Sequence, residues 1–270
     1  MTRGTSIRDA LHGAQTAIAA GGSDTPRLDA ELLLAHALGV ERTRLFLEDR
    51  TVEGPAVRRF QDLVRRRSVG REPVAYLLGR QGFRHLDLEV DPRVLIPRPE
   101  TEHAVEAVLE LAPAGARVVD VGTGSGAIAL ALKHERPDLR VTASDVSADA
   151  LAVAGANAQR LGLEVELVEA DLVPAGVWDV IVSNPPYVAV DDPAVAPGVR
   201  AHEPHLALYA GADGLDLIRR LVAARAGLLV LEVGAGQADT VAFLARAAGY
   251  GRTGVRPDLA GIERIVVAWA

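Results

Sequence analysis

The chain has 270 residues, of which 49% are hydrophobic and 24% charged, a profile typical of soluble globular proteins with one large or two ordinary domains. It contains no cysteine, which excludes disulfides, thiolate zinc sites and a cysteine nucleophile. No uninterrupted apolar run approaches the roughly 18 residues of a membrane span, and the start of the sequence lacks a signal-peptide core. We therefore expect a cytoplasmic protein.

The net charge of −7 is unevenly distributed along the chain. Residues 1–80 contain 13 basic and 10 acidic side chains, whereas the remaining residues contain 16 and 26. An acidic excess repels a polyanion, so we expect no direct binding of duplex nucleic acid by the larger part.

The first part, residues 1–79, is predicted to be a small helical domain without strands. Apolar residues recur at helical spacing in the segments 7–20, 26–40 and 54–70. The predicted face of the second segment consists of Leu28, Leu32, Ala35 and Leu38. The run Leu32–Leu34 is interpreted as part of the bundle core, with docking of a partner as the alternative. The basic run Arg65–Arg67 is interpreted as a solvated helix face, although it could also face an acidic partner or ribosomal RNA.

Residues 80–99 differ in character from the helical part. Phe83, Leu86 and Leu88 largely alternate with polar residues, which predicts a short hairpin. We interpret 80–99 as a linker and hinge to a third part at 100–270; the alternative is a lid over that part.

In the third part, strand and helix patterns alternate. The segments predicted as strands are 116–121, 140–145, 164–171, 178–183, 228–234 and 263–270. The segments predicted as helices are 126–135, 147–162, 213–226 and 237–248, with Ser147 as a helix cap. Such alternation predicts an α/β fold with an open, largely parallel sheet and helices on both faces. Ligands of these sheets bind at the carboxyl ends of the strands.

A glycine loop, Asp120-Val-Gly122-Thr-Gly124-Ser-Gly126, joins the first predicted strand to a helix. Glycines permit a tight turn and a close approach of ligand to backbone. Asp145 ends the next strand, where a carboxylate can accept hydrogen bonds from both hydroxyls of an adenosine ribose. Asp171 ends the third strand and is placed to face an adenine edge. The loop suits a dinucleotide or S-adenosylmethionine, and a plain strand-to-helix turn is the remaining interpretation.

The fourth predicted strand ends on Asn184-Pro185-Pro186-Tyr187. Proline holds the residue before it in an extended conformation and has no N–H of its own. The turn therefore presents two acceptors, the side-chain oxygen of Asn184 and the main-chain oxygen of Pro185, beside the flat ring of Tyr187. A planar NH₂ group fits, because its hydrogens can meet both oxygens while its π system stacks on the ring. Alternatively, the sequence is only a proline-rich turn that closes a strand.

Two acceptors that fix an amide or aromatic amine nitrogen direct its lone pair toward an electrophile. A sulfonium methyl group is an electrophile that needs no acid catalyst, whereas a dehydrogenase has no use for this turn. The predicted cofactor is therefore S-adenosylmethionine, with S-adenosylhomocysteine as the product, and Asn184 and Pro185 are the predicted catalytic residues.

The sequence resembles a known enzyme family in the phrases DVGTGSGAIAL, SNPPY, RLDAELLLAHALG, REPVAYLLG, VLIPRPETE and HEPHLALYAGADGLD. The family is that of the protein-(glutamine-N5) methyltransferases that modify bacterial class I peptide chain release factors. The resemblance extends from about residue 8 to the C-terminus. It implies a helical substrate-recognition domain, joined by a hairpin to a seven-stranded, Rossmann-like class I methyltransferase domain.

The resemblance also implies roles for single residues. The glycine loop would hold the methionine part of the cofactor, Asp145 the ribose and Asp171–Leu172 the adenine. The implied cofactor residues are Arg98, Thr101, Asp120, Gly122, Thr123, Gly124, Ser125, Gly126, Asp145, Val146, Asp171, Leu172 and Asn184. The residues implied to bind the substrate glutamine, which lies in a Gly-Gly-Gln motif, are Asn184, Pro185, Pro186 and Tyr187.

Two other functions stay open on the residues alone. An adenine-N6 methyltransferase acting on nucleic acid shares the Asn-Pro-Pro-Tyr turn, but it must extract a base and hold a polyanion. A non-catalytic cofactor sensor would have no use for Asn184. The histidines of the sequence His202-Glu203-Pro204-His205 have no further ligand cluster, so we expect no metal site. We expect a monomer.

Overall fold

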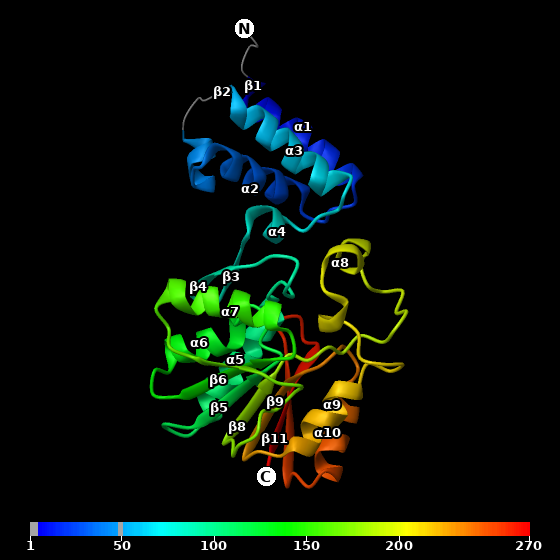
Figure 1. Ribbon diagram of the computed structural model, residues 1–270. Helices are drawn as coiled ribbons and strands as arrows, with labels where there is room; N and C mark the ends of the chain where they lie inside the picture. The colour runs from blue at the N-terminus through cyan, green and yellow to red at the C-terminus, as the bar shows by residue number, and fades with distance from the viewer. Residues whose placement is uncertain (1–4, 48–50) are drawn as a thin grey trace. The chain divides into compact units, whose positions relative to one another are not determined.

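The computed structural model describes residues 5–47 and 51–270; residues 1–4 and 48–50 of the predicted helical domain lie outside the described residues. Contacts divide the chain into two compact units, and most of their helices and strands are labelled in Figure 1. The first unit consists of residues 1–79 and 195–202, and the second of residues 80–194 and 203–270. The segment 80–99, predicted as a separate linker, groups with the second unit. None of the described helices combines the length and the apolar character that crossing a bilayer requires.

The first unit is mainly helical. Its helices are α1 (Ile7–Ala20), α2 (Pro26–Leu38), α3 (Pro55–Ser68), α4 (Val74–Leu78) and α8 (Pro197–His202), with the 3₁₀ helix η1 (Arg42–Phe46). Ile18, Leu33 and Leu34 are among the buried residues of its core. The prediction of no strands was wrong, because β1 (Thr5–Ser6) and β2 (Thr51–Val52) form a short antiparallel pair. Strands of two residues are too short to produce a periodic sequence signal.

The buried face of α2 agrees only in part with the predicted one. Ala35 is buried as predicted, and Leu33 and Leu34 are fully buried core residues as expected, whereas Leu28 is 39% exposed. Asp29 is buried on the same helix, where its carboxylate accepts a hydrogen bond from Arg67 Nε at 2.7 Å. A charged residue on the inner face breaks the apolar pattern on which the prediction relied.

The basic run of α3 pairs with carboxylates of its own unit. Arg65 Nη2 lies 2.8 Å from Asp62, and Arg66 Nε donates to Glu72 at 2.8 Å. The side chain of Arg67 is only 20% exposed. The prediction of a solvated helix face therefore fits Arg65, which is 69% exposed, and is wrong for Arg67.

The second unit is built on a seven-stranded sheet with the order β10-β11-β9-β8-β5-β6-β7. The strands are β5 (Arg117–Val121), β6 (Arg140–Asp145), β7 (Glu166–Glu169), β8 (Val180–Ser183), β9 (Leu228–Glu232), β10 (Arg252–Pro257) and β11 (Glu263–Trp269). The strands from β9 to β7 are parallel, and β11 is antiparallel to β9 and β10. The predicted α/β fold with a mainly parallel sheet is confirmed.

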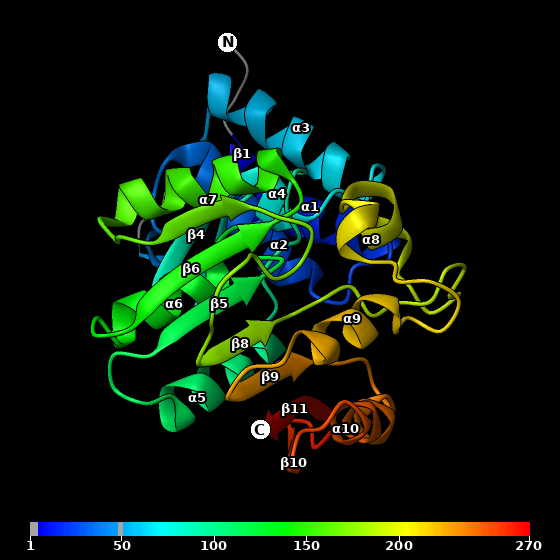
Figure 2. The ribbon, with the colours of Figure 1, turned by 60° about the horizontal axis from the view of Figure 1, so that its bottom comes forward.

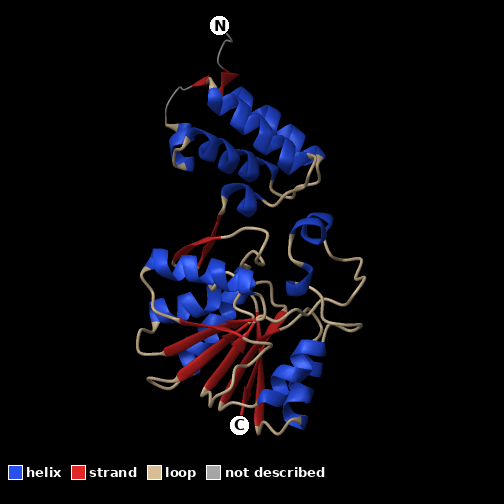
Figure 3. Ribbon diagram, viewed as in Figure 1, coloured by secondary structure: helices blue, strands red, loops and turns tan. Residues whose placement is uncertain are grey.

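Helices cover both faces of this sheet (Figures 2 and 3). They are α5 (Glu102–Leu111), α6 (Ala127–Glu135), α7 (Ala148–Leu161), α9 (Asp216–Ala224) and α10 (Ala238–Ala247), with the 3₁₀ helices η2 (Pro99–Thr101) and η3 (His205–Ala207). Alternate residues of β5 enter different cores: Val118 packs with α5 and α6, and Val119 with α9 and α10. The predicted hairpin is confirmed as β3 (Arg80–Phe83) and β4 (Leu86–Glu89), and Phe83 belongs to the same core as Val118.

The topology gathers the predicted site at one edge of the sheet. β5 lies between β6 and β8, so the chain leaves β5 at the point where the strand order reverses. The carboxyl ends of these parallel strands carry the glycine loop, Asp145 and Asn184. A ligand site is expected at such a switch point.

Candidate active site

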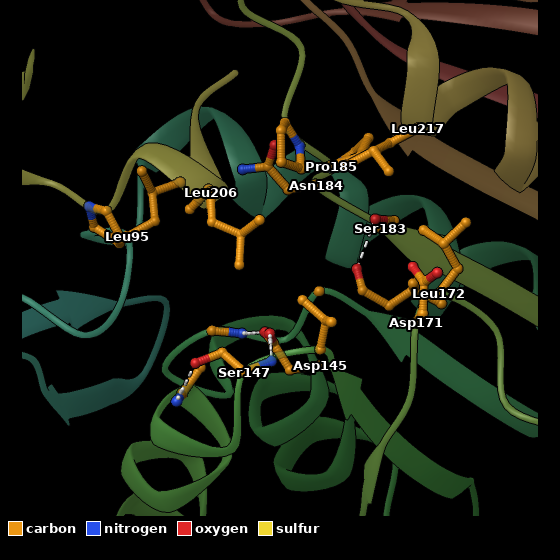
Figure 4. Close-up of a pocket in the computed structure, with 18 of the residues that line it drawn as sticks. Leu95, Asp145, Ser147, Asp171, Leu172, Ser183, Asn184, Pro185, Leu206 and Leu217 are labelled. Carbon is orange, nitrogen blue, oxygen red and sulfur yellow. Dashed lines mark hydrogen bonds between the residues drawn. The ribbon is translucent and has the colours of Figure 1, made fainter. Parts of the chain in front are cut away.

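A cavity of about 320 Å³ lies at the carboxyl ends of these strands. Figure 4 shows Asn184 and Pro185 on one side of it and Asp145 and Ser147 on the opposite side. The predicted site residues that line the cavity are Gly122, Gly124, Asp145, Val146, Asp171, Leu172, Asn184, Pro185 and Pro186. Those that are not part of its lining are Arg98, Thr101, Asp120, Thr123, Ser125, Gly126 and Tyr187. The turn and the acidic strand ends therefore share one cavity.

The glycine loop turns sharply between β5 and α6. Gly122 has a φ of 72°, which favours glycine, and its N–H donates to the main-chain oxygen of Ser144 at 2.8 Å. A Cβ on Gly126 would lie 2.9 Å from Leu130 Cδ1, so this glycine also permits close packing of the loop on α6. These positions explain why the loop needs glycine.

Asp120, the second-to-last residue of β5, is a buried carboxyl group. Its Oδ2 accepts hydrogen bonds from Thr123 Oγ1 at 2.6 Å and from the N–H of Ala129 at 3.1 Å. Its Oδ1 is buried and has no hydrogen-bond partner in the described part of the chain. Burial raises the pKa of Asp120 to about 7, against the two hydrogen bonds, which lower it.

Asp145 joins the glycine loop to the end of β6. Its Oδ2 accepts from the N–H of Gly124 and its Oδ1 from the N–H of Ser147, both at 2.9 Å. Each carboxylate oxygen can accept a further hydrogen bond, so the group can still serve a ligand in the cavity that it lines.

Asp171 and Arg220 form an exposed ion pair at another part of the cavity lining. Arg220 Nη2 from α9 donates to Asp171 Oδ2 at 2.8 Å, and this bond lowers the pKa of Asp171 below its usual range. The neighbouring Leu172 has a φ of 76°, a strained value for a leucine, and its main-chain oxygen accepts from Ser144 Oγ at 3.2 Å.

The Asn184–Tyr187 turn leaves its two predicted acceptors unengaged. Asn184 Nδ2 donates to Thr101 Oγ1 at 3.0 Å. Within residues 5–47 and 51–270, no hydrogen bond engages Asn184 Oδ1 or the main-chain oxygen of Pro185. The hydroxyl of Tyr187 points to a carboxylate, since it donates to Glu232 Oε1 at 3.3 Å.

Arg98 and Thr101, which precede α5, contact carboxylates of the protein itself. Arg98 Nη2 donates to Glu203 Oε1 at 2.5 Å, and Glu203 is only 3% exposed. Thr101 Oγ1 donates to Glu232 Oε2 at 2.6 Å. In this structure both side chains hold protein elements together beside the cavity.

Sequence reasoning missed several residues of this region, and three of them illustrate why. Arg220 and Leu206 line the cavity, and Glu232 binds both Thr101 and Tyr187. Glu232 could have been found, because it is an acidic residue that ends a buried parallel strand, as Asp145 does. No comparable local signal distinguishes Arg220 from other arginines of amphipathic helices.

The histidine pair does not form a cluster of ligands. His202 belongs to the first unit, where its Nε2 lies 2.7 Å from the main-chain oxygen of Gly70, whereas His205 belongs to the second. Among the described residues, no group of three His, Cys, Asp or Glu side chains is placed to hold a metal ion.

The fold and the site define a methyltransferase. Two family models match the chain, "PrmC N-terminal domain" over residues 9–79 and "Methyltransferase small domain" over residues 101–197. A methyltransferase from Pyrococcus furiosus superposes with a TM-score of 0.52 at 18% identity, covering 68% of this chain and 88% of that one. The hMettl16 catalytic domain, solved with MAT2A 3′UTR hairpin 1, gives a TM-score of 0.55 at 17% identity and 80% coverage of both chains. At these identities the likeness shows the fold alone.

Sequence relatives define the family. Proteins named release factor glutamine methyltransferase are 42% identical in Koribacter versatilis, 43% in Deinococcus radiodurans and 46% in Moorella thermoacetica. Each alignment covers 97% of this chain and 97% or 98% of the relative. The chain therefore belongs to the release factor glutamine methyltransferase family.

The cofactor of this methyltransferase is S-adenosylmethionine, and the residues present fit it. The unpartnered Oδ1 of Asp120 can be satisfied by a cationic amino group such as that of the cofactor's methionine part. A Cβ on Gly122 or Gly124 would meet nothing within 4 Å, so the loop backbone is open where both residues line the cavity.

Proposed function

We propose that this protein transfers the methyl group of S-adenosylmethionine to the side-chain amide nitrogen of a glutamine in bacterial class I peptide chain release factors. The glutamine is that of the Gly-Gly-Gln motif. The observation that carries the proposal is the rigid turn at Asn184–Tyr187, whose two acceptor oxygens are left free by the described residues beside the cofactor cavity. Full-length similarity to enzymes named for release factor glutamine supports the choice of substrate.

The cofactor would be held by residues from three strand ends. Asp120 would face the amino group, Asp145 the ribose hydroxyls, and Asp171 with Leu172 the adenine. The remaining residues assigned to the cofactor are Gly122, Thr123, Gly124, Ser125, Gly126 and Val146, while Arg98 and Asn184 would border its pocket. When bound, the cofactor supplies an electrophilic methyl group that needs no acid catalyst.

The turn would position the substrate amide. Asn184 Oδ1 and the main-chain oxygen of Pro185 would accept the two amide hydrogens, while Pro186 and Tyr187 would border the group. An amide nitrogen is a weak nucleophile because its lone pair is delocalised. Holding both hydrogens favours the geometry in which the lone pair faces the methyl group, and preorganised acceptors can contribute several kcal/mol, up to ~7–11 for ideal positioning. The amide proton then leaves to water.

The release factor is the proposed partner, and the helical first unit is the proposed recognition domain. We further propose a cytoplasmic monomer that does not bind duplex nucleic acid directly. The surplus of acidic residues after residue 80, 26 against 16 basic, supports the last point.

One labelling experiment tests the proposed function. The protein is incubated with methyl-labelled S-adenosylmethionine and either purified release factor or adenine-containing RNA, and the labelled residue is identified by mass spectrometry. Label is expected on the glutamine of the Gly-Gly-Gln motif and absent from a release factor with alanine at that position. Label on RNA alone would favour the adenine-N6 alternative, and no label on either would favour a cofactor sensor.

A further inference from the structure

Three side chains connect Asn184 to a buried carboxylate. Asn184 Nδ2 donates to Thr101 Oγ1 at 3.0 Å, and Thr101 Oγ1 donates to Glu232 Oε2 at 2.6 Å. Thr101 and Glu232 are 4% and 1% exposed. The register of the parallel strands explains the proximity: Ser183 of β8 pairs with Leu231 of β9, so Asn184 and Glu232 are the next residues at adjacent strand ends.

The direction of this chain of hydrogen bonds is determined by the carboxylate. An ionised Glu232 only accepts, so the single proton of the Thr101 hydroxyl is directed to it. The oxygen of Thr101 can then only accept from Asn184, which requires the NH₂ side of the amide. Asn184 Oδ1 is consequently the end left without a partner among the described residues.

We propose that Glu232, acting through Thr101, is a positioning residue that fixes the amide of Asn184 with its oxygen available to the substrate NH₂ group. This inference rests on the proposed function, in which Asn184 Oδ1 accepts a hydrogen of the substrate amide. It assigns Thr101 a different role from the border of the cofactor pocket that the family resemblance implies.

Protonation of Glu232 permits the opposite direction. A neutral carboxyl group can donate to Thr101, whose hydroxyl can then donate to Asn184 Oδ1, so that the amide turns its NH₂ outward. The groups that face Glu232 are the hydroxyls of Thr101 and Tyr187, the cationic Arg264 and the anionic Glu100. Burial raises the pKa of Glu232 to about 7, while the two hydroxyls and Arg264 favour its ionised form.

The test uses two substitutions at Thr101 that separate the hydroxyl from the methyl group. Thr101→Val removes the hydroxyl, and Thr101→Ser retains it. We expect Thr101→Val to lower kcat/KM for the release factor by roughly 10- to 100-fold, because the Asn184 amide loses the partner that orients it, while the affinity for S-adenosylhomocysteine stays within about twofold. Thr101→Ser should stay within about threefold of the wild type.

A matched control exists in the same sheet. Thr142 is also 4% exposed, and its Oγ1 donates to Glu166 Oε2 at 2.9 Å. Thr142→Val removes a similar hydroxyl–carboxylate bond outside the cavity lining, and should leave kcat/KM within about twofold. Thermal melts of all variants verify that they are folded.

A pH profile tests the carboxylate. At saturating cofactor, the wild-type rate should fall as the pH decreases below about 7, and Glu232→Gln, which cannot ionise, should show no such decrease between pH 6 and 8. The same decrease in Glu232→Gln would overturn the proposal.

The other outcomes are equally distinct. Equal activity of Thr101→Val and wild type would overturn the positioning role while leaving the proposed function intact. If Thr101→Val loses cofactor affinity to the same extent as activity, the positioning role is overturned and Thr101 instead binds the cofactor. If the wild type itself does not label glutamine, the proposed function fails instead.

Discussion

Asp120 and Glu232 are carboxyl groups at the ends of buried strands, each with a pKa raised to about 7 chiefly by burial. A raised pKa means that the folded state favours the protonated form. The preference of the folded state for the two protonated groups adds to the free energy of unfolding in full below pH about 4, the ordinary carboxyl pKa. This addition is lost as the pH rises toward about 7. At neutral pH a buried, partly ionised carboxyl group destabilises the ligand-free fold. The presence of two such groups beside the cavity is consistent with a role in binding.

For Asp120, the prediction concerns cofactor affinity. The affinity for S-adenosylhomocysteine should increase with pH between about 5.5 and 7, by up to about tenfold per unit, because an ionised Oδ1 attracts the ligand's amino group, which stays protonated there. Asp120→Asn should bind more weakly and without this dependence. Calorimetric titrations at several pH values measure both. A wild-type affinity that is constant over this range would refute the role of Asp120.

At the scale of elements, Asn157 of α7 connects the hairpin to the glycine loop. Its Oδ1 accepts from the N–H of Glu89 at 2.7 Å, and its Nδ2 donates to the main-chain oxygens of Glu89 and Ser125 at 2.9 and 3.0 Å. Asn157 is fully buried. The hairpin, interpreted from sequence as a linker, is thus fastened to the loop that would hold the cofactor.

Asn157→Ala should destabilise the protein by about 2–4 kcal/mol, because it leaves several buried backbone groups of β4 and the loop unpaired. Chemical denaturation measures the free energy of unfolding. Gln159→Ala, on the exposed side of the same helix, is the control and should change it by less than about 0.5 kcal/mol. Comparable effects of the two substitutions would contradict the connecting role.

Most elements with strong periodicity were predictable from sequence, whereas an edge strand and one helix of the second unit were not. The strand at 116–121 and the helix at 147–162 correspond to β5 and α7, and Ser147 caps α7 by accepting from the N–H of Ala150 at 3.2 Å. The strand β10 was missed, because it is an edge strand without a fully buried residue. Helix α5 was also not predicted, although its buried residues follow a helical pattern.

The site was predictable where chemistry lies in a contiguous motif. The glycine loop and the Asn184–Tyr187 turn lie at strand ends, where sequence alternation places them. The connection from Asn184 through Thr101 to Glu232 was not predictable, because 83 and 131 positions separate these pairs in sequence. The strand register places Asn184 beside Glu232, and the tertiary packing of the segment before α5 adds Thr101.

At the scale of the whole molecule, charge separates the protein-substrate function from the nucleic-acid alternative. The second unit, which contains the cavity, has 26 acidic and 16 basic residues. We predict no detectable binding of duplex RNA at roughly 10 µM protein and physiological salt, because a polyanion requires a basic surface. Gel-shift titration checks this, and salt-sensitive binding at that concentration would contradict it.

The most direct test of the account is the effect of Asn184→Ala on methyl transfer and on cofactor affinity, measured side by side with Asp145→Ala. If Asn184 positions the substrate amide, the rate at saturating cofactor should fall by about 100-fold or more, while the affinity for S-adenosylhomocysteine changes by less than about threefold. Asp145→Ala should instead weaken cofactor binding. A loss of cofactor affinity in Asn184→Ala as large as that in Asp145→Ala would contradict the account.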